Sequence, residues 1–319
     1  MDQGSPQIEP LLKQRPKKRF KILLYALIII LILSIVVTAG ISGYIGWQLT
    51  HPPTRPLETT PAKMQLAYED IEFKSRGDEL KMKGWYIPPK EEDKQMTVII
   101  AHGYKQNRVQ ADVPALEIAD KLVDSGYGVV MFDFRNSGES EGKVTSVGQF
   151  EKNDLLGAID WVKAQSNGQI ALLGFSMGAT TSILAAAEEP EVGGVLVDSP
   201  FSKLRTYLED NLSVWSDLPK YPFTPFIMAI IPPLTGLSVD EVDALAAVDN
   251  VYPRPILFIH GEEDTKIPFS ESEKMWKKHP DAFDFWKAPK GDHMKVYQYQ
   301  KELYLDKMFT FLDNLSSEH

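Results

Sequence analysis

The chain has 319 residues, of which 43% are hydrophobic, 24% charged and 10% aromatic. This balance fits a folded protein and excludes disordered, collagen-like and coiled-coil classes. The chain contains no cysteine, which excludes disulfides, thiolate metal sites, iron–sulfur clusters and a cysteine nucleophile. The length fits one large α/β domain with an appendage as well as it fits two domains.

The net charge of −10 is unevenly distributed along the chain. Residues 1–21 carry six basic side chains against Asp2 and Glu9, a net +4, which leaves −14 for the remainder. So acidic a body repels phosphate backbones, and we expect no nucleic-acid partner.

An uncharged apolar segment, Ile22 to Trp47, follows this basic tail. As a helix it would extend about 39 Å, more than the ~30 Å hydrocarbon core of a bilayer, so residues 22–47 are predicted to form a transmembrane helix. The basic tail, residues 1–21, should remain cytoplasmic. The prediction is a single-pass protein of the cell membrane with an extracytoplasmic body.

A cleaved signal peptide, and hence secretion, is the alternative for the same segment, because Val37-Thr38-Ala39 offers small residues for cleavage. The apolar stretch continues past this point to Trp47, which favours an uncleaved anchor. Ala39 and Gly43 form one small-xxx-small step. Small residues are frequent in membrane helices, so we do not expect this step to pair helices.

Residues 48–64 form a proline-rich segment between the apolar stretch and the rest of the chain. Such segments favour extended, semi-rigid conformations, and we predict a stalk that holds the body off the membrane. Residues 65–319 should form that body.

Short apolar runs alternate with helical patterns through the body. Glu69–Lys74 and Leu80–Tyr86 predict an antiparallel hairpin. Further strands are predicted at Thr97–Ala101, Val129–Phe132, Ile170–Leu173, Gly194–Val197, Ile256–Ile259 and Phe283–Trp286. This alternation predicts an α/β fold with a mostly parallel sheet covered by helices on both faces.

The segment of about residues 201–248 is too long for an ordinary connection between strands. We predict an inserted cap there, rich in apolar and aromatic side chains. Trp215, Phe223 and Phe226 are the cap residues that we expect to contact a hydrophobic substrate.

The sequence Gly174-Phe175-Ser176-Met177-Gly178 follows a predicted strand and precedes a helix-forming stretch. This context is typical of a nucleophile elbow, in which glycines permit a tight turn that exposes the serine hydroxyl. A serine becomes nucleophilic when a base accepts its proton. Ser176 is therefore the candidate nucleophile, and a histidine should serve it.

His293 is the candidate base among six histidines. It follows the last predicted strand, at the carboxyl edge of the sheet, where ligands of open α/β sheets bind. We expect His102 and His260 to have structural roles. His279 should be a solvated residue near a helix C-terminus.

An acid and an oxyanion hole would complete such a site. Asp264, in an acidic turn between the serine and the histidine, is the candidate acid that orients the imidazole, with Glu263 as the alternative. The backbone N–H groups of Met177 and Tyr104 are predicted to form the oxyanion hole.

These motifs, with His102-Gly103, Asp133–Ser140 and Asp198-Ser199-Pro200, resemble the serine hydrolases of the α/β-hydrolase superfamily over roughly residues 69–315. The chain is similar to membrane-anchored or secreted bacterial members described as esterase-like or serine-aminopeptidase-like. The resemblance implies an eight-stranded sheet, a Ser-Asp-His triad and a two-amide oxyanion hole. No metal-binding or glycine-rich phosphate motif occurs, so we expect no metal and no cofactor.

We expect a serine hydrolase that cleaves carboxylic esters through an acyl-Ser176 intermediate, with a small-molecule or lipid-like ester as its partner. An aminopeptidase-like amide hydrolase is an alternative, in which Glu209, Asp210 or Asp217 would hold a free amino terminus. A catalytically silent binding protein on the same fold is the second alternative.

Overall fold

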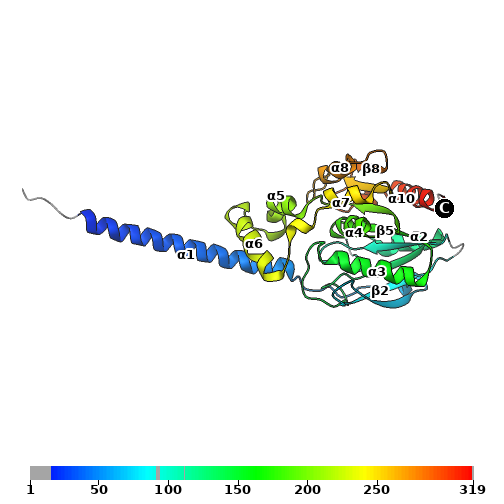
Figure 1. Cartoon of the computed structure of the whole chain (residues 1–319), viewed down its shortest axis with the longest axis horizontal. Helices are drawn as coiled ribbons and strands as arrows, with labels where there is room; N and C mark the ends of the chain where they lie inside the picture. Colours follow the sequence, from blue (N-terminus) through cyan, green and yellow to red (C-terminus); the bar gives the residue numbers. More distant parts are fainter. Residues whose placement is uncertain (1–15, 91–93, 111, 318–319) are drawn as a thin grey trace, which may run out of the picture.

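The computed structural model describes residues 16–90, 94–110 and 112–317. One long helix, α1 (Pro16–Thr50), projects from a body built around an eight-stranded sheet (Figure 1). The sheet has the order β1-β2-β4-β3-β5-β6-β7-β8. Its strands are β1 (Glu69–Lys74), β2 (Lys81–Ile87), β3 (Met96–Ala101), β4 (Gly128–Phe132), β5 (Gln169–Phe175), β6 (Val192–Asp198), β7 (Ile256–Gly261) and β8 (Phe283–Ala288).

The pairing of the strands is mixed at one end of the sheet and parallel elsewhere. β2 pairs antiparallel with both β1 and β4, and the other neighbours are parallel. The predicted strands are confirmed, each to within two residues at either end. The mostly parallel α/β fold predicted from the alternating pattern is therefore confirmed.

Helices cover both faces of the sheet, so its central strands are buried on both sides. They are α2 (Ala115–Asp124), α3 (Glu151–Gln165), α4 (Met177–Glu188), α7 (Ala244–Val251), α8 (Ser270–Trp276), α9 (Val296–Tyr299) and α10 (Lys301–Ser317). Successive side chains of a strand point to opposite faces, so Val98 and Ile100 enter one core, with α2 and α10. Ile99 and Ala101 enter the other, with α3, α4 and α7.

The insertion after β6 forms a cap of two helices, α5 (Leu204–Ser216) and α6 (Lys220–Thr235), followed by a short 3₁₀ turn, Val239–Glu241. The predicted insertion ran to residue 248, but α7 already belongs to the body. Its residues Ala244, Val248 and Val251 are fully buried in the core shared with α4. The cap is therefore shorter than the predicted segment.

The apolar helix α1 is longer than the predicted segment 22–47 at both ends, because the helix runs from Pro16 to Thr50. Residues Lys18–Thr50 are long and apolar enough to cross a membrane. A helix of this kind near the N-terminus is either a membrane anchor or a signal sequence.

The residues after α1 lie against the body. The N–H of Thr145 donates to the carbonyl of Thr50 at 2.8 Å, and the side-chain amide of Asn107 donates to the carbonyls of Arg55 and Pro56 at 3.2 and 3.0 Å. An extended proline-rich segment forms no internal hydrogen bonds, so its carbonyl groups need donors from elsewhere. Here the body supplies these donors. The segment is thus bound along the body, which differs from the predicted spacer.

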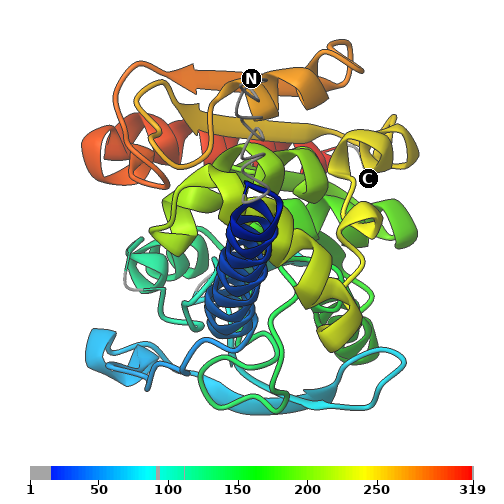
Figure 2. The same cartoon turned by 90° about the vertical axis from the view of Figure 1, so that its left-hand side faces the viewer.

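The last turns of α1 pack against the cap helix α6 (Figures 1 and 2). Gly43 and Gly46 lie in this interface, where a Cβ atom on Gly46 would fall 2.3 Å from Cγ1 of Ile231. Gly46 therefore lets two helices of the same chain approach closely. The Ala39–Gly43 step does not make this close contact, because a Cβ atom on Gly43 would lie 3.9 Å from Cγ2 of Ile230, an ordinary distance.

Candidate active site

Ser176 occupies a strained turn between β5 and α4, with φ 52° and ψ −114°. A Cβ atom on Gly178 would lie 2.1 Å from the carbonyl oxygen of Ala101, and one on Gly174 would lie 2.4 Å from the carbonyl oxygen of Gly178. No residue with a side chain fits such approaches, so these two glycines permit the turn. The backbone N–H of Ser176 donates to the carbonyl of Asp198 at 2.8 Å and holds the turn against β6.

The structure brings Ser176, His293 and Asp264 together although they are far apart in the sequence. Nε2 of His293 lies 2.9 Å from Oγ of Ser176, and Nδ1 lies 2.8 Å from Oδ2 of Asp264. A carboxylate accepts, so Nδ1 carries the proton and Nε2 is left to accept the serine hydroxyl proton. His293 is 4% exposed, which shields this chain of hydrogen bonds from water.

The carboxylate of Asp264 is fully buried and satisfied on both oxygens. Its Oδ1 accepts the backbone N–H groups of Lys266 and Ile267 at 2.9 and 2.8 Å, and Oδ2 faces His260 as well as His293. Burial raises the pKa of Asp264, but the hydrogen bonds from His260 and His293 outweigh it and hold the pKa well below its ordinary value. Asp264 is therefore ionised, whereas Glu263, the alternative acid, is exposed.

His260 has the structural role expected for it, and it supports Asp264, a partner that the sequence analysis did not name. Its Nε2 lies 2.8 Å from the carbonyl of Ile267 and 3.2 Å from Oδ2 of Asp264, so Nε2 carries the proton. Its Nδ1 then accepts from the hydroxyl of Ser272 at 2.7 Å. The four-residue spacing from His260 to Asp264 was the one available sequence signal for this pair.

The loop after β3 is braced from two sides. Nε2 of the buried His102 accepts the N–H of Phe134 at 3.0 Å, so Nδ1 donates to the carbonyl of Gly103 at 2.8 Å. Burial lowers the pKa of His102, which favours this neutral form. Gln110, also buried, accepts the N–H of Gly103 at 2.7 Å through Oε1. His102 thus has the structural role expected for it.

This braced loop lies directly beside the elbow. A Cβ atom on Gly103 would be 3.7 Å from Cβ of Ser176. Tyr104 follows on the loop, and Met177 is the first residue of α4. Within the part of the chain that the structure describes, no hydrogen-bond acceptor is found for the backbone N–H of either residue. Both donors are therefore available next to Ser176.

Residues 76–297 match the X-Pro dipeptidyl-peptidase (S15) family. The chain belongs to this family. With its fold and its serine elbow, it is a hydrolase of the α/β-hydrolase superfamily, as the sequence resemblance implied.

Proteins similar to this S15-family hydrolase include an uncharacterised bacterial protein, an esterase and a lipase. The Bacillus subtilis protein YqkD is 31% identical over 74% of this chain and 76% of its own length. An esterase from Pyrococcus furiosus has a TM-score of 0.69 and 26% identity, covering 83% of this chain and 98% of the esterase. The lysophosphatidylserine lipase ABHD12 of Xenopus tropicalis is 30% identical over 49% of this chain and 40% of its own.

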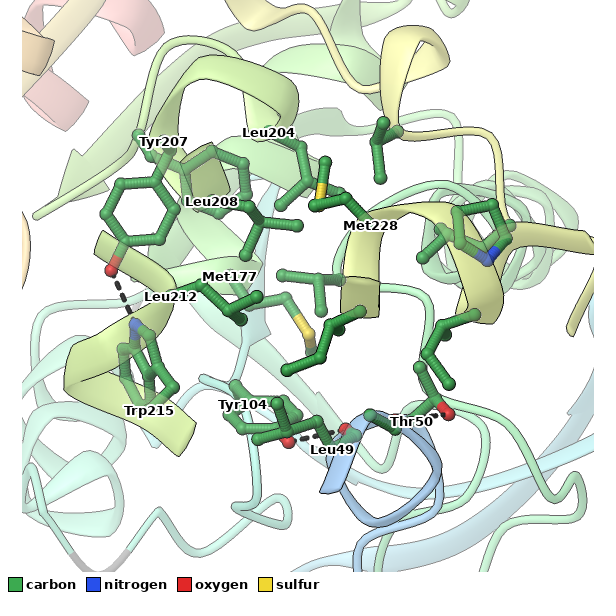
Figure 3. Close-up of a pocket in the computed structure, with 18 of the residues that line it drawn as sticks. Leu49, Thr50, Tyr104, Met177, Leu204, Tyr207, Leu208, Leu212, Trp215 and Met228 are labelled. Atoms are coloured by element: carbon green, nitrogen blue, oxygen red, sulfur yellow. Dashed lines mark hydrogen bonds between the residues drawn. The ribbon is translucent and has the colours of Figure 1, made fainter. Parts of the chain in front are cut away.

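An apolar cavity of the hydrolase opens from Ser176 between the elbow, the cap and the end of α1 (Figure 3). Among the described residues that line it, none carries a charge. Leu204, Leu208, Leu212 and Met228 of the cap form much of its wall. Such a lining suits a hydrocarbon group rather than a charged one.

Of the three cap residues predicted to contact substrate, Trp215 alone lines the cavity. Its Nε1 donates to the hydroxyl of Tyr207 at 2.7 Å, and its ring meets that of His293 edge-on with centroids 6.5 Å apart. Phe223 and Phe226 are not among the cavity residues, so the expectation for them is wrong.

The helical phase of α6 explains this difference. Thr224, Ile227 and Ile231 are the buried residues of α6, and Ile227 and Ile231 face the cavity. Phe223 and Phe226 each precede a buried position by one residue, about 100° around the helix. Hydrophobic character alone did not reveal which face of α6 is turned inward.

The acidic cap residues that an aminopeptidase would need lie outside the cavity. Asp210 pairs with Lys220 at 2.9 Å, and Glu209 lies 3.7 Å from Arg205. Neither these two nor Asp217 belongs to the residues that line the cavity.

Proposed function

We propose that this hydrolase cleaves carboxylic esters with a hydrophobic acyl group through an acyl-Ser176 intermediate. The observation that carries the proposal is that Ser176 lines an uncharged cavity. A hydrocarbon chain in this cavity would place its ester carbonyl at the elbow.

The reaction would proceed in two halves. His293 accepts the proton of Ser176 through Nε2 as Oγ attacks the ester carbon, and Asp264 stabilises the imidazolium that forms. The backbone N–H groups of Met177 and Tyr104 donate to the oxyanion. His293 then protonates the departing alcohol, and water, activated by the same imidazole, hydrolyses the acyl-enzyme.

The cavity argues against a peptidase that recognises a free amino terminus, although the family is described by such an activity. A buried ammonium group requires a carboxylate partner, and the cavity residues include none. The similarity to the Pyrococcus esterase and, over a shorter stretch, to the Xenopus lysophosphatidylserine lipase also supports ester cleavage.

We place the hydrolase at the cell membrane, held by α1 as an uncleaved anchor with its body outside the cytoplasm. The basic residues at the start of the chain and the length of α1 support this orientation. Secretion after cleavage near Ala39 is the alternative.

The full chain in detergent, assayed with p-nitrophenyl octanoate and with an aminoacyl-prolyl p-nitroanilide, tests the reaction. We expect turnover of the ester to exceed that of the anilide, and Ser176→Ala to lower ester turnover by about 10³-fold or more. Faster cleavage of the anilide would favour the peptidase. A folded chain that binds the ester without turning it over would favour the silent binding protein.

A further inference from the structure

The end of α1 forms one wall of the cavity beside Ser176. Gly46, Leu49 and Thr50, all from the last turns of α1, line the cavity together with the cap. The hydroxyl of Tyr104 donates to the carbonyl of Leu49 and joins α1 to the loop beside the elbow (Figure 3). The helix that leaves the body is thus a part of the binding site.

The contact between α1 and α6 is close and apolar. A Cβ atom on Gly46 would lie 2.3 Å from Cγ1 and 2.7 Å from Cδ1 of Ile231, whereas one on Gly40 would have nothing within 4 Å. Leu49 packs on the cluster of buried cap residues that includes Ile227 and Ile231. The position of this cavity wall is therefore fixed by how closely α1 can approach α6.

The exposed, uncharged part of α1 covers most of a bilayer core. Residues 18–37 of the helix are exposed, and burial begins at Thr38, where the cap covers the helix. The uncharged residues 22–37 extend about 24 Å at 1.5 Å per residue, so a hydrocarbon core of ~30 Å that begins at Ile22 ends near residue 41. Gly46 lies about five residues, or roughly 7 Å, beyond that point. The cavity wall therefore begins at the membrane surface.

The cap helix that packs against α1, α6, is uncharged after its first residue, Lys220. Residues 221–239 contain no charged side chain. Tyr221 and Leu234, near the two ends of α6, are 72% and 63% exposed. The cap is the part of the body nearest to the projecting length of α1 (Figure 1). The uncharged residues 221–239 at this place can touch the bilayer without burying a charge.

We propose that the hydrolase takes a single-chain lipid ester directly from the bilayer that α1 crosses. The acyl chain enters the cavity between α1 and α6, and the end of α1 sets the chain length that is accepted. This inference rests on the proposed ester hydrolysis and on α1 as a membrane anchor.

A substitution in the α1 wall tests the inference. The full chain is reconstituted in phosphatidylcholine vesicles, and turnover of monooleoylglycerol is divided by turnover of monobutyrylglycerol. We expect Leu49→Trp to lower this ratio on the order of tenfold, the loss of about two buried methylene groups. Gln48→Trp, on the exposed side of the same turn, should leave the ratio unchanged.

A second pair of variants covers the case in which Leu49→Trp does not fold. Gly46→Ala places a methyl group against Ile231 and should lower the ratio, whereas Gly40→Ala has open space and should not. Labelling of Ser176 by a fluorophosphonate shows that each variant retains its active site. An unchanged ratio in labelled Leu49→Trp or Gly46→Ala overturns the inference. Absence of ester turnover in the unaltered chain counts instead against the proposed function.

Discussion

The carboxylate of Asp264 is the most constrained group of the candidate site. Two backbone N–H groups and two imidazoles surround it, and its side chain is inaccessible to solvent. A buried charge is tolerated only with such partners. Because the carboxylate of Asp264 is fixed in place, it also fixes the ring of His293, whose Nε2 points at Ser176.

Replacing Asp264 by asparagine should disturb the tautomer of the His293 ring while leaving the fold intact. The side-chain N–H of an asparagine can donate a hydrogen bond to Nδ1 of His293, which favours the wrong tautomer, so we expect kcat for p-nitrophenyl octanoate to fall by about 10³–10⁴. Glu263→Gln, one position away on the exposed side of the turn, should change kcat by less than about twofold. Loss of activity in Glu263→Gln with activity retained in Asp264→Asn would reassign the acid to Glu263.

Asp198, at the end of β6, should make stability depend on pH. Burial raises the pKa of its carboxyl to about 6, although the hydroxyl of Ser199 donates to it at 2.9 Å. The folded state therefore keeps a proton that the unfolded state releases above about pH 4, so the free energy of unfolding falls as the pH rises from about 4 to 6.

We expect Asp198→Asn to be more stable than the unaltered chain at about pH 8, by up to about 3 kcal/mol, and the two to converge below about pH 4. Thermal unfolding in detergent at both pH values measures this difference. A difference that does not depend on pH would contradict the raised pKa of Asp198.

Among the helices and strands, features that depend on a short stretch of sequence are predicted well, whereas contacts between distant parts of the chain are missed. Each strand was predicted because its apolar run is short and bounded. The positions of Ser176, Asp264 and His293 follow, because each lies on a loop at the carboxyl end of a strand. The α1 wall was not predicted, since the contact of Gly46 with Ile231 joins residues far apart in the chain.

We predict that the exposed side of α6 contacts the bilayer. Leu234 is 63% exposed on α6, and Leu303 is 42% exposed on α10, at the opposite end of the body from α1 (Figure 1). We expect Leu234→Glu to slow hydrolysis of monooleoylglycerol in vesicles several-fold, because a charge is costly at the apolar interface. Leu303→Glu is the matched control and should hydrolyse the vesicle lipid normally. Equal rates for both variants would place α6 away from the bilayer.

The whole molecule is arranged along one direction, from α1 through the cap to the sheet (Figure 1). The cavity lies where these three parts meet, and Ser176 is among the residues that line it. The helix proposed as the anchor and the cavity proposed to bind substrate therefore lie next to each other.

This arrangement predicts a definite orientation in the cell membrane. In a bacterial host, protease added to spheroplasts should digest the body while a tag at residue 1 remains protected. An uncleaved anchor also keeps that tag and Ser176 in one polypeptide. A protected body would contradict the orientation, and release of a chain beginning near residue 40 would show cleavage of a signal peptide.

Covalent labelling tests the central claim, an activated Ser176 hydroxyl, most directly. The full chain in detergent is incubated with a fluorophosphonate, digested and analysed by mass spectrometry. We predict one adduct on the peptide that contains Ser176, no adduct in Ser176→Ala and slow labelling in His293→Ala. A folded, unaltered chain that stays unlabelled at Ser176 would contradict the account.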